Sequence, residues 1–247
     1  MERLGILDWG IGGISIYKLI KAKQPGAAVT YFSDTGVTPY GKMTGPELVE
    51  RLDTVIAHFK VRGVGQLVIG CNAASTAIPH LRESGLRIVG VIEPAVEMTA
   101  EINPRRLGLI GGRRTVVSGV YRKAFSNRGI PIQQRIAQPL SALIESGDVS
   151  SEKLRDEAEH ILGPIRKCSH ILLACTHYPA ITPMLKTLVS PLTEFIDPAG
   201  ALLQRIGDWR IDKGEDEFLT SGDPKMMQHS ARMAFGVEIA RPSNPGF

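Results

Sequence analysis

Residues 67–72, LVIGCN, and residues 171–176, ILLACT, are two copies of one pattern, an apolar run that ends on a cysteine. A matching segment precedes each run, RLGIL at 3–7 and RLGLI at 106–110. The two cysteines, Cys71 and Cys175, are 104 residues apart, and the two leading segments are 103 residues apart. This duplication predicts two similar halves, related by an approximate two-fold axis, that bring one thiol each to the two sides of a shared cleft. Chemistry at both faces of a single carbon atom requires such a pair of opposed acid/base groups.

Short apolar runs alternate with amphipathic stretches along the chain, which is typical of βαβ units around a mainly parallel sheet. We therefore expect an α/β fold with a first domain at 1–95, a second at 96–205, and a final segment at 206–247 that returns to the first. Pro94 is expected to discourage a regular element and so to mark the crossing between the halves. The expected strands are 4–7, 29–32, 67–69, 87–91, 107–110, 132–136, 171–173 and 194–196, and the expected helices are 15–23, 45–62, 73–84, 116–127, 151–167, 183–189 and 226–235.

Composition restricts the class of protein. The formal net charge of +4 comes from 29 Lys and Arg against 25 Asp and Glu, with a sequence pI near 9.0. The excess is scattered, which argues against nucleic-acid binding and suits an anionic small molecule. The sequence shows no leader and no apolar stretch near 18 residues, so we expect a cytosolic protein without a membrane segment. Three cysteines without a CxxC pattern predict reduced thiols and no zinc site.

The first cysteine motif places Cys71 at the end of a strand, directly before a helix. Asn72 is a candidate cap for that helix, and the amides at a helix N-terminus favour a thiolate over a thiol. The competing interpretation is a small buried hydrophobic residue. The matching position of Cys175 favours the reactive interpretation.

The second motif, residues 175–179 (CTHYP), adds an imidazole two residues after the thiol. His177 can tune the charge of Cys175 or exchange protons with a substrate, while Thr176 is a candidate helix cap. Cys/His nucleophilic catalysis is the main competitor. It needs only one cysteine and leaves Cys71 unexplained.

Three loops carry further candidates. Asp8 precedes a glycine-rich loop that lacks the dinucleotide-binding spacing, and it is either a partner for an ammonium group or thiol, or a turn or cap residue. Tyr40 and Gly41 lie in a loop where a hydroxyl and an amide can hold a carboxylate. Asp34 and Glu145 follow apolar runs and are either functional or solvated turn residues. Cys168 lies outside the matched positions and is expected to be structural.

Together these motifs resemble the cofactor-independent aspartate/glutamate racemase superfamily, and within it most closely the glutamate racemases. The resemblance covers nearly the whole chain. The segments that carry it are Asp8 with Gly10, Gly12 and Gly13, Asp34-Thr35, Pro39-Tyr40-Gly41, Cys71-Asn72 with Ala74-Ser75, Glu93-Pro94, Thr115 with Ser118-Gly119 and Tyr121, residues 175–179, Asp197-Pro198-Ala199 and residues 220–223.

The resemblance implies two pseudosymmetric α/β domains with a small amino-acid substrate held between them. One cysteine, as thiolate, removes the α-proton, and the other, as thiol, returns a proton to the opposite face without pyridoxal phosphate, any other cofactor or a metal. Catalytic roles fall on Cys71, Cys175, Asp8 and His177. Substrate contacts fall on Trp9, Tyr40, Gly41, Asn72, Ala73, Thr115 and Thr176. Self-association into a homodimer is left open.

The chain departs from glutamate racemases at three substrate-binding positions. Trp9 stands where those enzymes usually have Ser, and Ala73 and Gly112 stand where they usually have Thr. Because hydroxyls that bind substrate are missing, we expect these positions to set substrate choice. The alternatives are a superfamily enzyme for aspartate, a hydantoin or a malonate, and a catalytically silent binding or regulatory protein. Retention of both cysteines argues against the silent alternative.

Overall fold

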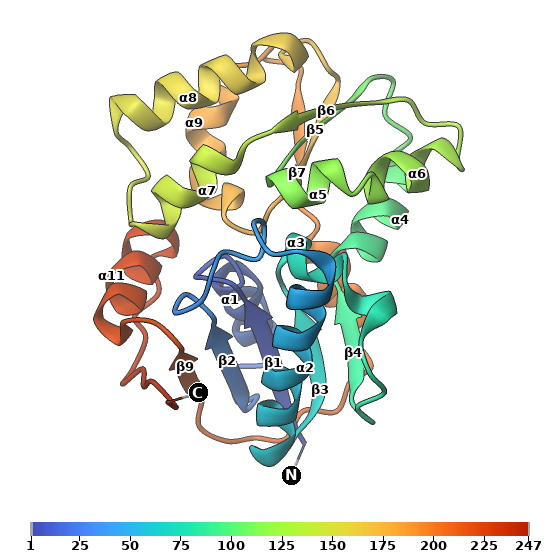
Figure 1. Ribbon diagram of the computed structural model, residues 1–247. Coiled ribbons are helices and arrows are strands. Elements are labelled where there is room, and N and C mark those ends of the chain that lie inside the picture. Colours follow the sequence, from blue (N-terminus) through green and yellow to red (C-terminus); the bar gives the residue numbers. More distant parts are fainter. Residues whose placement is uncertain (1, 247) are drawn as a thin grey trace.

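The computed structural model describes residues 2–246 and contains two parallel β-sheets (Figure 1). The first sheet has the order β4-β3-β1-β2-β9 and the second has the order β6-β5-β7-β8. Every strand pair in both sheets is parallel. The strands are β1 Arg3–Asp8, β2 Val29–Ser33, β3 Val64–Ile69, β4 Arg87–Gly90, β5 Leu107–Gly111, β6 Ile132–Ile136, β7 His170–Ala174, β8 Glu194–Ile196 and β9 Glu217–Thr220.

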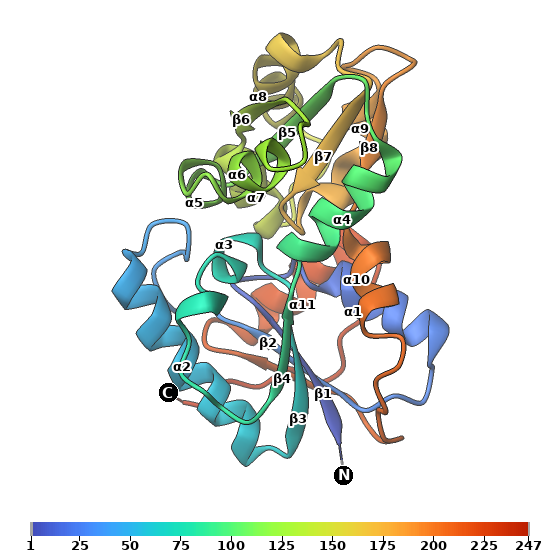
Figure 2. The ribbon, with the colours of Figure 1, turned by 90° about the vertical axis from the view of Figure 1, so that its right-hand side faces the viewer.

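The two sheets repeat one topology. The order β8-β7-β5-β6 in the second sheet reproduces β4-β3-β1-β2 in the first, and β9 is added at the edge of the first. Helices cover both faces of each sheet (Figure 2). The expected α/β fold with two similar halves is therefore confirmed, and all eight expected strands form. We call the part built on the first sheet the first lobe and the part built on the second sheet the second lobe.

The helices between and after these strands have the following bounds: α1 Ile14–Lys23, α2 Gly45–Val61, α3 Asn72–Ser75, α4 Ile92–Ile102, α5 Arg113–Val117, α6 Val120–Ser126, α7 Gln138–Glu145, α8 Glu152–Leu162, α9 Thr182–Lys186, α10 Ala199–Arg205 and α11 Pro224–Phe235. Three short 3-10 helices are η1 Ile78–His80, η2 Gly163–Ile165 and η3 Tyr178–Ile181. Among residues 2–246, none of the helices is both long enough and apolar enough to cross a membrane.

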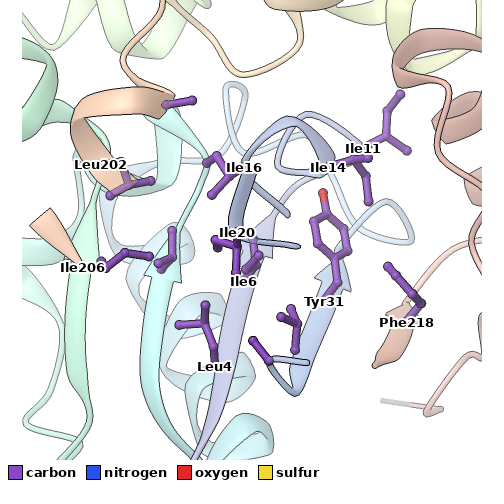
Figure 3. Packing of buried hydrophobic residues seen from close by; sticks show 14 of the residues in the cluster. Leu4, Ile6, Ile11, Ile14, Ile16, Ile20, Tyr31, Leu202, Ile206 and Phe218 are labelled. Carbon is purple, nitrogen blue, oxygen red and sulfur yellow. The ribbon is translucent and has the colours of Figure 1, made fainter. Parts of the chain in front are cut away.

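Strand β1 shows how the first lobe is built. Successive side chains of a strand point to opposite faces, so Leu4 and Ile6 join the core on one face and Leu7 joins the core on the other. Figure 3 shows Leu4 and Ile6 among side chains from α1 and α10. On the opposite face, a Cβ at Gly5 would lie 3.1 Å from Cδ1 of Phe59, so glycine allows α2 to pack closely.

Four expected helices are shorter than predicted, because breakers outweigh periodicity. The expected helix 73–84 is α3 followed by η1, since a helix through Pro79 would place its ring against the carbonyl four residues earlier. The expected helix 116–127 is split into α5 and α6 at Gly119, whose φ is 71°. Pro164 lies in η2, directly after the end of α8. Helix α9 covers Thr182–Lys186 rather than 183–189.

The crossing between the halves lies at Pro94 as expected, but the expectation that Pro94 discourages a regular element was wrong. Pro94 lies in the first turn of α4, where the missing N–H costs nothing because that amide has no intrahelical partner. Helix α4 joins the two lobes and contacts α10 (Figure 2). Two other helices, α7 and α10, were also not predicted.

The C-terminal part of the chain runs along the first lobe. Strand β9 pairs with β2, and α11 contacts α1 in the first lobe and α7 in the second (Figure 1). The domain boundaries near 95 and 205 remain predictions.

Candidate active site

A pocket that is partly open to solvent lies where the two lobes meet. Parallel strands end at the same edge of a sheet, so residues that follow β1, β3, β5 and β7 reach it together. The lining residues are Asp8, Trp9, Pro39, Tyr40, Gly41, Cys71, Asn72, Ala73, Gly112, Arg114, Thr115, Gln138, Ser141, Ala174, Cys175, Thr176 and His177. The structure thus brings all eleven predicted site residues, and Gly112, to one pocket.

Cys71 is the thiol of the first lobe. It is 9% exposed and is the N-cap residue of α3, a helix of four residues. Burial raises the pKa of Cys71 well above its ordinary value, and the carboxylate of Asp8 raises it further, whereas the amides of Ala74 and Trp9 oppose the shift. The expected preference for a thiolate was therefore wrong, because desolvation outweighs the amides of so short a helix.

Cys175 is the thiol of the second lobe and begins a chain of polar groups. Its Sγ lies 3.6 Å from Nδ1 of His177, and Nε2 of His177 lies 2.6 Å from Oε2 of Glu145. Burial opposes protonation of His177, but Cys175 and Glu145 together raise the pKa of the imidazole well above its ordinary value. The imidazole therefore lies between this thiol and a carboxylate.

Glu145 is a functional candidate that the sequence left open between a functional and a solvated turn residue. Besides contacting His177, its Oε2 accepts a hydrogen bond from the amide of Ile11, at 2.9 Å, in the glycine loop of the first lobe. The periodicity of α7 contains the available signal. Gln138, Ser141 and Glu145 are spaced i, i+3 and i+7, which places them on one helix face.

Asp8 connects the two lobes. It is 1% exposed, and it accepts hydrogen bonds from the amide of Trp9 and from Oγ1 of Thr176, both at 2.7 Å. Helix α1 has Gly13 at its N-cap, so Asp8 does not cap it. Thr176 was expected to cap a helix, but its hydroxyl is committed to Asp8. Burial raises the pKa of Asp8, and the charge of His177 and the Thr176 hydroxyl oppose that shift.

The glycines after Asp8 permit this contact between lobes. A Cβ at Gly10 would overlap the carboxylate of Glu145, and a Cβ at Gly12 would overlap Thr176 and His177. The hydroxyl of Tyr31 donates to the carbonyl of Gly10 at 2.7 Å and so supports the loop from below (Figure 3). The loop therefore needs glycine for close approach of the second lobe.

Two expected roles differ in the structure. Asn72 was a candidate helix cap, but Cys71 occupies the N-cap, and Oδ1 of Asn72 accepts a hydrogen bond from Tyr121 at 2.7 Å. Its buried Nδ2 has no partner among the described residues. The hydroxyl of Tyr40 was expected to hold a carboxylate of the ligand, but it donates to Oδ2 of Asp34 at 2.6 Å.

Asp34 is a buried structural carboxylate rather than a solvated turn residue. It forms a bidentate ion pair with Arg51, at 2.6 and 2.8 Å, and accepts from Ser221 at 2.7 Å. Cys168 packs in the core of the second lobe and does not line the pocket.

The three departures from the family pattern all face the pocket. The indole Nε1 of Trp9 donates to the carbonyl of Val37 at 3.4 Å, which holds the ring in place. A Cβ at Gly112 would lie 3.1 Å from Oε1 of Gln138, so a larger residue there requires Gln138 to move. Arg114, Gln138 and Ser141 also line the pocket and were not singled out from the sequence. Within residues 2–246, no three side chains of His, Cys, Asp or Glu are grouped as metal ligands would be.

Comparisons with known proteins agree with this geometry. The model of the family described as Asp/Glu/Hydantoin racemase matches residues 18–206. Glutamate racemase from Aquifex aeolicus is 32% identical over 244 residues, covering 96% of this chain and 95% of that protein. Among solved structures, glutamate racemase from Aquifex pyrophilus superposes with a TM-score of 0.82 at 26% identity and covers 99% of each chain. Glutamate racemase from Francisella tularensis, solved with D-glutamate, gives a TM-score of 0.84 at 22% identity and covers 98% of this chain and 96% of that one.

Proposed function

The chain belongs to the Asp/Glu/Hydantoin racemase family, and from this premise we propose that it interconverts L- and D-glutamate by proton transfer between two cysteines. One observation carries the proposal: the two lobes contribute one cysteine each, from equivalent strand ends, to the same pocket. Inversion at a carbon atom needs a proton acceptor on one face and a proton donor on the other. Cys71 and Cys175 supply this pair.

The environments of the two thiols suggest their states before reaction. Cys71 stays protonated, because burial and Asp8 raise its pKa. For Cys175 we propose the thiolate as the starting state of this direction, with Nδ1 of His177 3.6 Å from its Sγ. In one direction Cys175 takes the α-proton, the C–H electron pair remains on the α-carbon, and Cys71 donates its proton to the opposite face. The thiolate has then moved to Cys71, and the reverse direction starts from that state.

Other pocket residues hold the substrate. We propose that Asp8 binds the α-ammonium group and that the unpartnered Nδ2 of Asn72 donates to the α-carboxylate. An ammonium group beside Asp8 also offsets the negative charge that raises the pKa of Cys71. Glu145 acts as a positioning residue, because it holds His177 against Cys175. Trp9, Ala73 and Gly112 shape the rest of the pocket. Since the chemistry needs reduced thiols, we propose a cytoplasmic setting.

The direct test follows hydrogen at the α-carbon. L-glutamate is incubated with the protein in D₂O, loss of the α-proton signal is measured by NMR, and formation of D-glutamate is measured by circular dichroism. We expect exchange and racemisation with both enantiomers. Aspartate and glutamine serve as comparison substrates. Absence of exchange with every amino acid contradicts the proposal, and faster exchange with aspartate would assign a different substrate.

A plot of kcat/KM against pH should be bell-shaped. Activity requires one thiolate and one thiol, so kcat/KM rises as the first cysteine ionises and falls as the second does. Because burial and Asp8 raise the pKa of Cys71 well above its ordinary value of about 9, the falling limb should lie in strongly alkaline solution. The measurement is kcat/KM against pH, with an α-deuterium isotope effect to show that proton transfer limits the rate. A flat profile under those conditions would be inconsistent with two thiols as the acid/base pair.

A further inference from the structure

Among residues 2–246, Arg114 is the one Lys or Arg side chain that lines the pocket. It belongs to the short helix α5 of the second lobe and is partly buried. The mechanism above assigns it no role. A cation in a pocket proposed to bind an amino acid requires an explanation.

Two neutral acceptors from the first lobe orient the guanidinium group. Nε of Arg114 donates to Oγ1 of Thr76 at 3.0 Å, and Nη1 donates to the carbonyl oxygen of Met43 at 2.9 Å. A guanidinium group has five N–H donors, so these two bonds leave three N–H groups, one on Nη1 and two on Nη2, for a further acceptor. Planar guanidinium donors of this kind can bind the two oxygens of a carboxylate in a bidentate manner.

The charge of Arg114 has no carboxylate partner among residues 2–246. None of these carboxylates lies at ion-pair distance from Arg114, whereas Arg51 and Arg62 each have one and Arg205 has two. Burial lowers the pKa of Arg114, opposed by the nearby Cys71, so this position disfavours the cation. A partly buried charge without a partner gains most when an anionic ligand binds.

The positions of the other pocket residues that contact the substrate indicate which of its carboxylates Arg114 would bind. The α-carbon must lie between Cys71 and Cys175, where Asp8 and Asn72 account for the ammonium and the α-carboxylate. Tyr40 does not compete for a second carboxylate, because its hydroxyl is committed to Asp34. Arg114 is then the cation that remains for the distal end of the substrate.

We propose that Arg114 binds the side-chain carboxylate of the substrate and so makes the pocket selective for amino acids with an acidic side chain. This inference rests on the proposed function and identifies the group that recognises the substrate. Because the guanidinium is anchored on the first lobe and carried by the second, it is positioned before substrate arrives, which lowers the entropic cost of binding.

The test compares two substrates that have nearly the same size and differ by one charge, D-glutamate and D-glutamine. We expect the wild-type protein to exchange the α-proton of glutamate with the higher kcat/KM. Arg114→Met should lower kcat/KM for glutamate about 10- to 100-fold and leave glutamine nearly unchanged, since a hydrogen-bonded charge pair is lost. Arg114→Lys keeps the charge but loses the planar pair of N–H donors, so its kcat/KM for glutamate should lie between those of wild type and Arg114→Met. The matched control is Arg113→Met, which removes the same charge from the exposed neighbouring residue outside the pocket.

A binding measurement separates this inference from the proposed function. Glutarate, a dicarboxylate without an α-amino group, is titrated by calorimetry into wild type, Arg114→Met and Arg113→Met. If glutarate binds wild type and Arg113→Met but not Arg114→Met, while no amino acid exchanges its α-proton, the proposed function fails and the role of Arg114 stands.

The opposite outcome overturns the inference alone. If Arg114→Met retains the glutamate preference of wild type and the same Kd for glutarate, Arg114 does not recognise the acidic side chain, although racemisation stands. Wild-type protein that binds no glutarate and prefers glutamine overturns it as well. Thermal unfolding of Arg114→Met and Thr76→Val, which removes the Nε acceptor at constant charge, measures any loss of stability. Should Arg114→Met fail to fold, Arg114→Gln is used for the same comparison.

Discussion

Replacing either Cys71 or Cys175 with alanine is expected to lower glutamate racemisation by at least about 10⁴-fold, because each variant lacks the acid/base group for one face of the α-carbon and no other described group substitutes for it. Exchange should survive in part. Each single variant retains one thiol and should still exchange the α-proton of one enantiomer with D₂O. The measurements are racemisation by circular dichroism and exchange by NMR, each with D- and L-glutamate.

The selectivity of the two variants is the decisive result. Cys71→Ala and Cys175→Ala should exchange opposite enantiomers, because their remaining thiols belong to different lobes. Cys168→Ala is the matched control, since this thiol packs in the core of the second lobe outside the pocket. Full racemisation by either pocket variant would refute the two-thiol mechanism. Exchange of the same enantiomer by both would show that the two thiols do not serve opposite faces.

The meeting of Cys71 and Cys175 in one pocket could be predicted, because it depends on a local strand pattern that occurs twice in the sequence. Two apolar runs of similar length end on Cys71 and Cys175, and parallel strands deliver the residues after them to one edge of a sheet. The similar leading segments at 3–7 and 106–110 then place both edges at one cleft. The order of the strands confirms this reasoning. The sequence therefore predicted the fold class and the place of both cysteines in one pocket.

Groups that depend on packing between lobes could not be predicted. Glu145 reaches the amide of Ile11 only because α7 faces the glycine loop of the first lobe, and Arg114 reaches the pocket only because α5 lies against α3. Neither contact has a short-range signature. The ionisation of Cys71 was misjudged for the same reason. Its neighbours in sequence suggest a helix N-terminus, but the tertiary structure buries the thiol, and burial outweighs that local effect.

Helix ends were misjudged for a different reason. Periodicity predicts that a segment is helical, but it does not show which proline or glycine in the segment ends the helix. Pro79 ends one expected helix, whereas Pro94 lies harmlessly in a first turn, and the difference is only the position of each proline relative to the helix start. The sequence alone does not show at which residue each helix starts, and so it does not show where the proline falls within the helix.

Asp8→Asn is expected to lower kcat/KM about 10²- to 10³-fold in both directions while keeping the size of the side chain. A buried ammonium group of the substrate would lose its counter-charge, at a cost of about 3–5 kcal/mol. In addition, the amide NH₂ of asparagine would oppose one of two donors, the Trp9 amide or the Thr176 hydroxyl, that now meet the carboxylate. The measurement is racemisation of D- and L-glutamate under saturating and limiting substrate.

Asp8→Asn should also make Cys71 easier to ionise, although it lowers the activity. The Asp8 carboxylate raises the pKa of Cys71, so its removal should lower that pKa and move the alkaline limb of the pH profile to lower pH. Alkylation of Cys71 by iodoacetamide, with Cys168→Ser and Cys175→Ser as background, reports the ionisation directly. Asp156→Asn, an exposed carboxylate on α8, is the matched control and should leave the midpoint unchanged. An unchanged or higher midpoint in Asp8→Asn would mean that burial alone keeps Cys71 protonated. Binding of the substrate ammonium to Asp8 would then not ease ionisation of Cys71, and the reverse reaction would need another source for its thiolate.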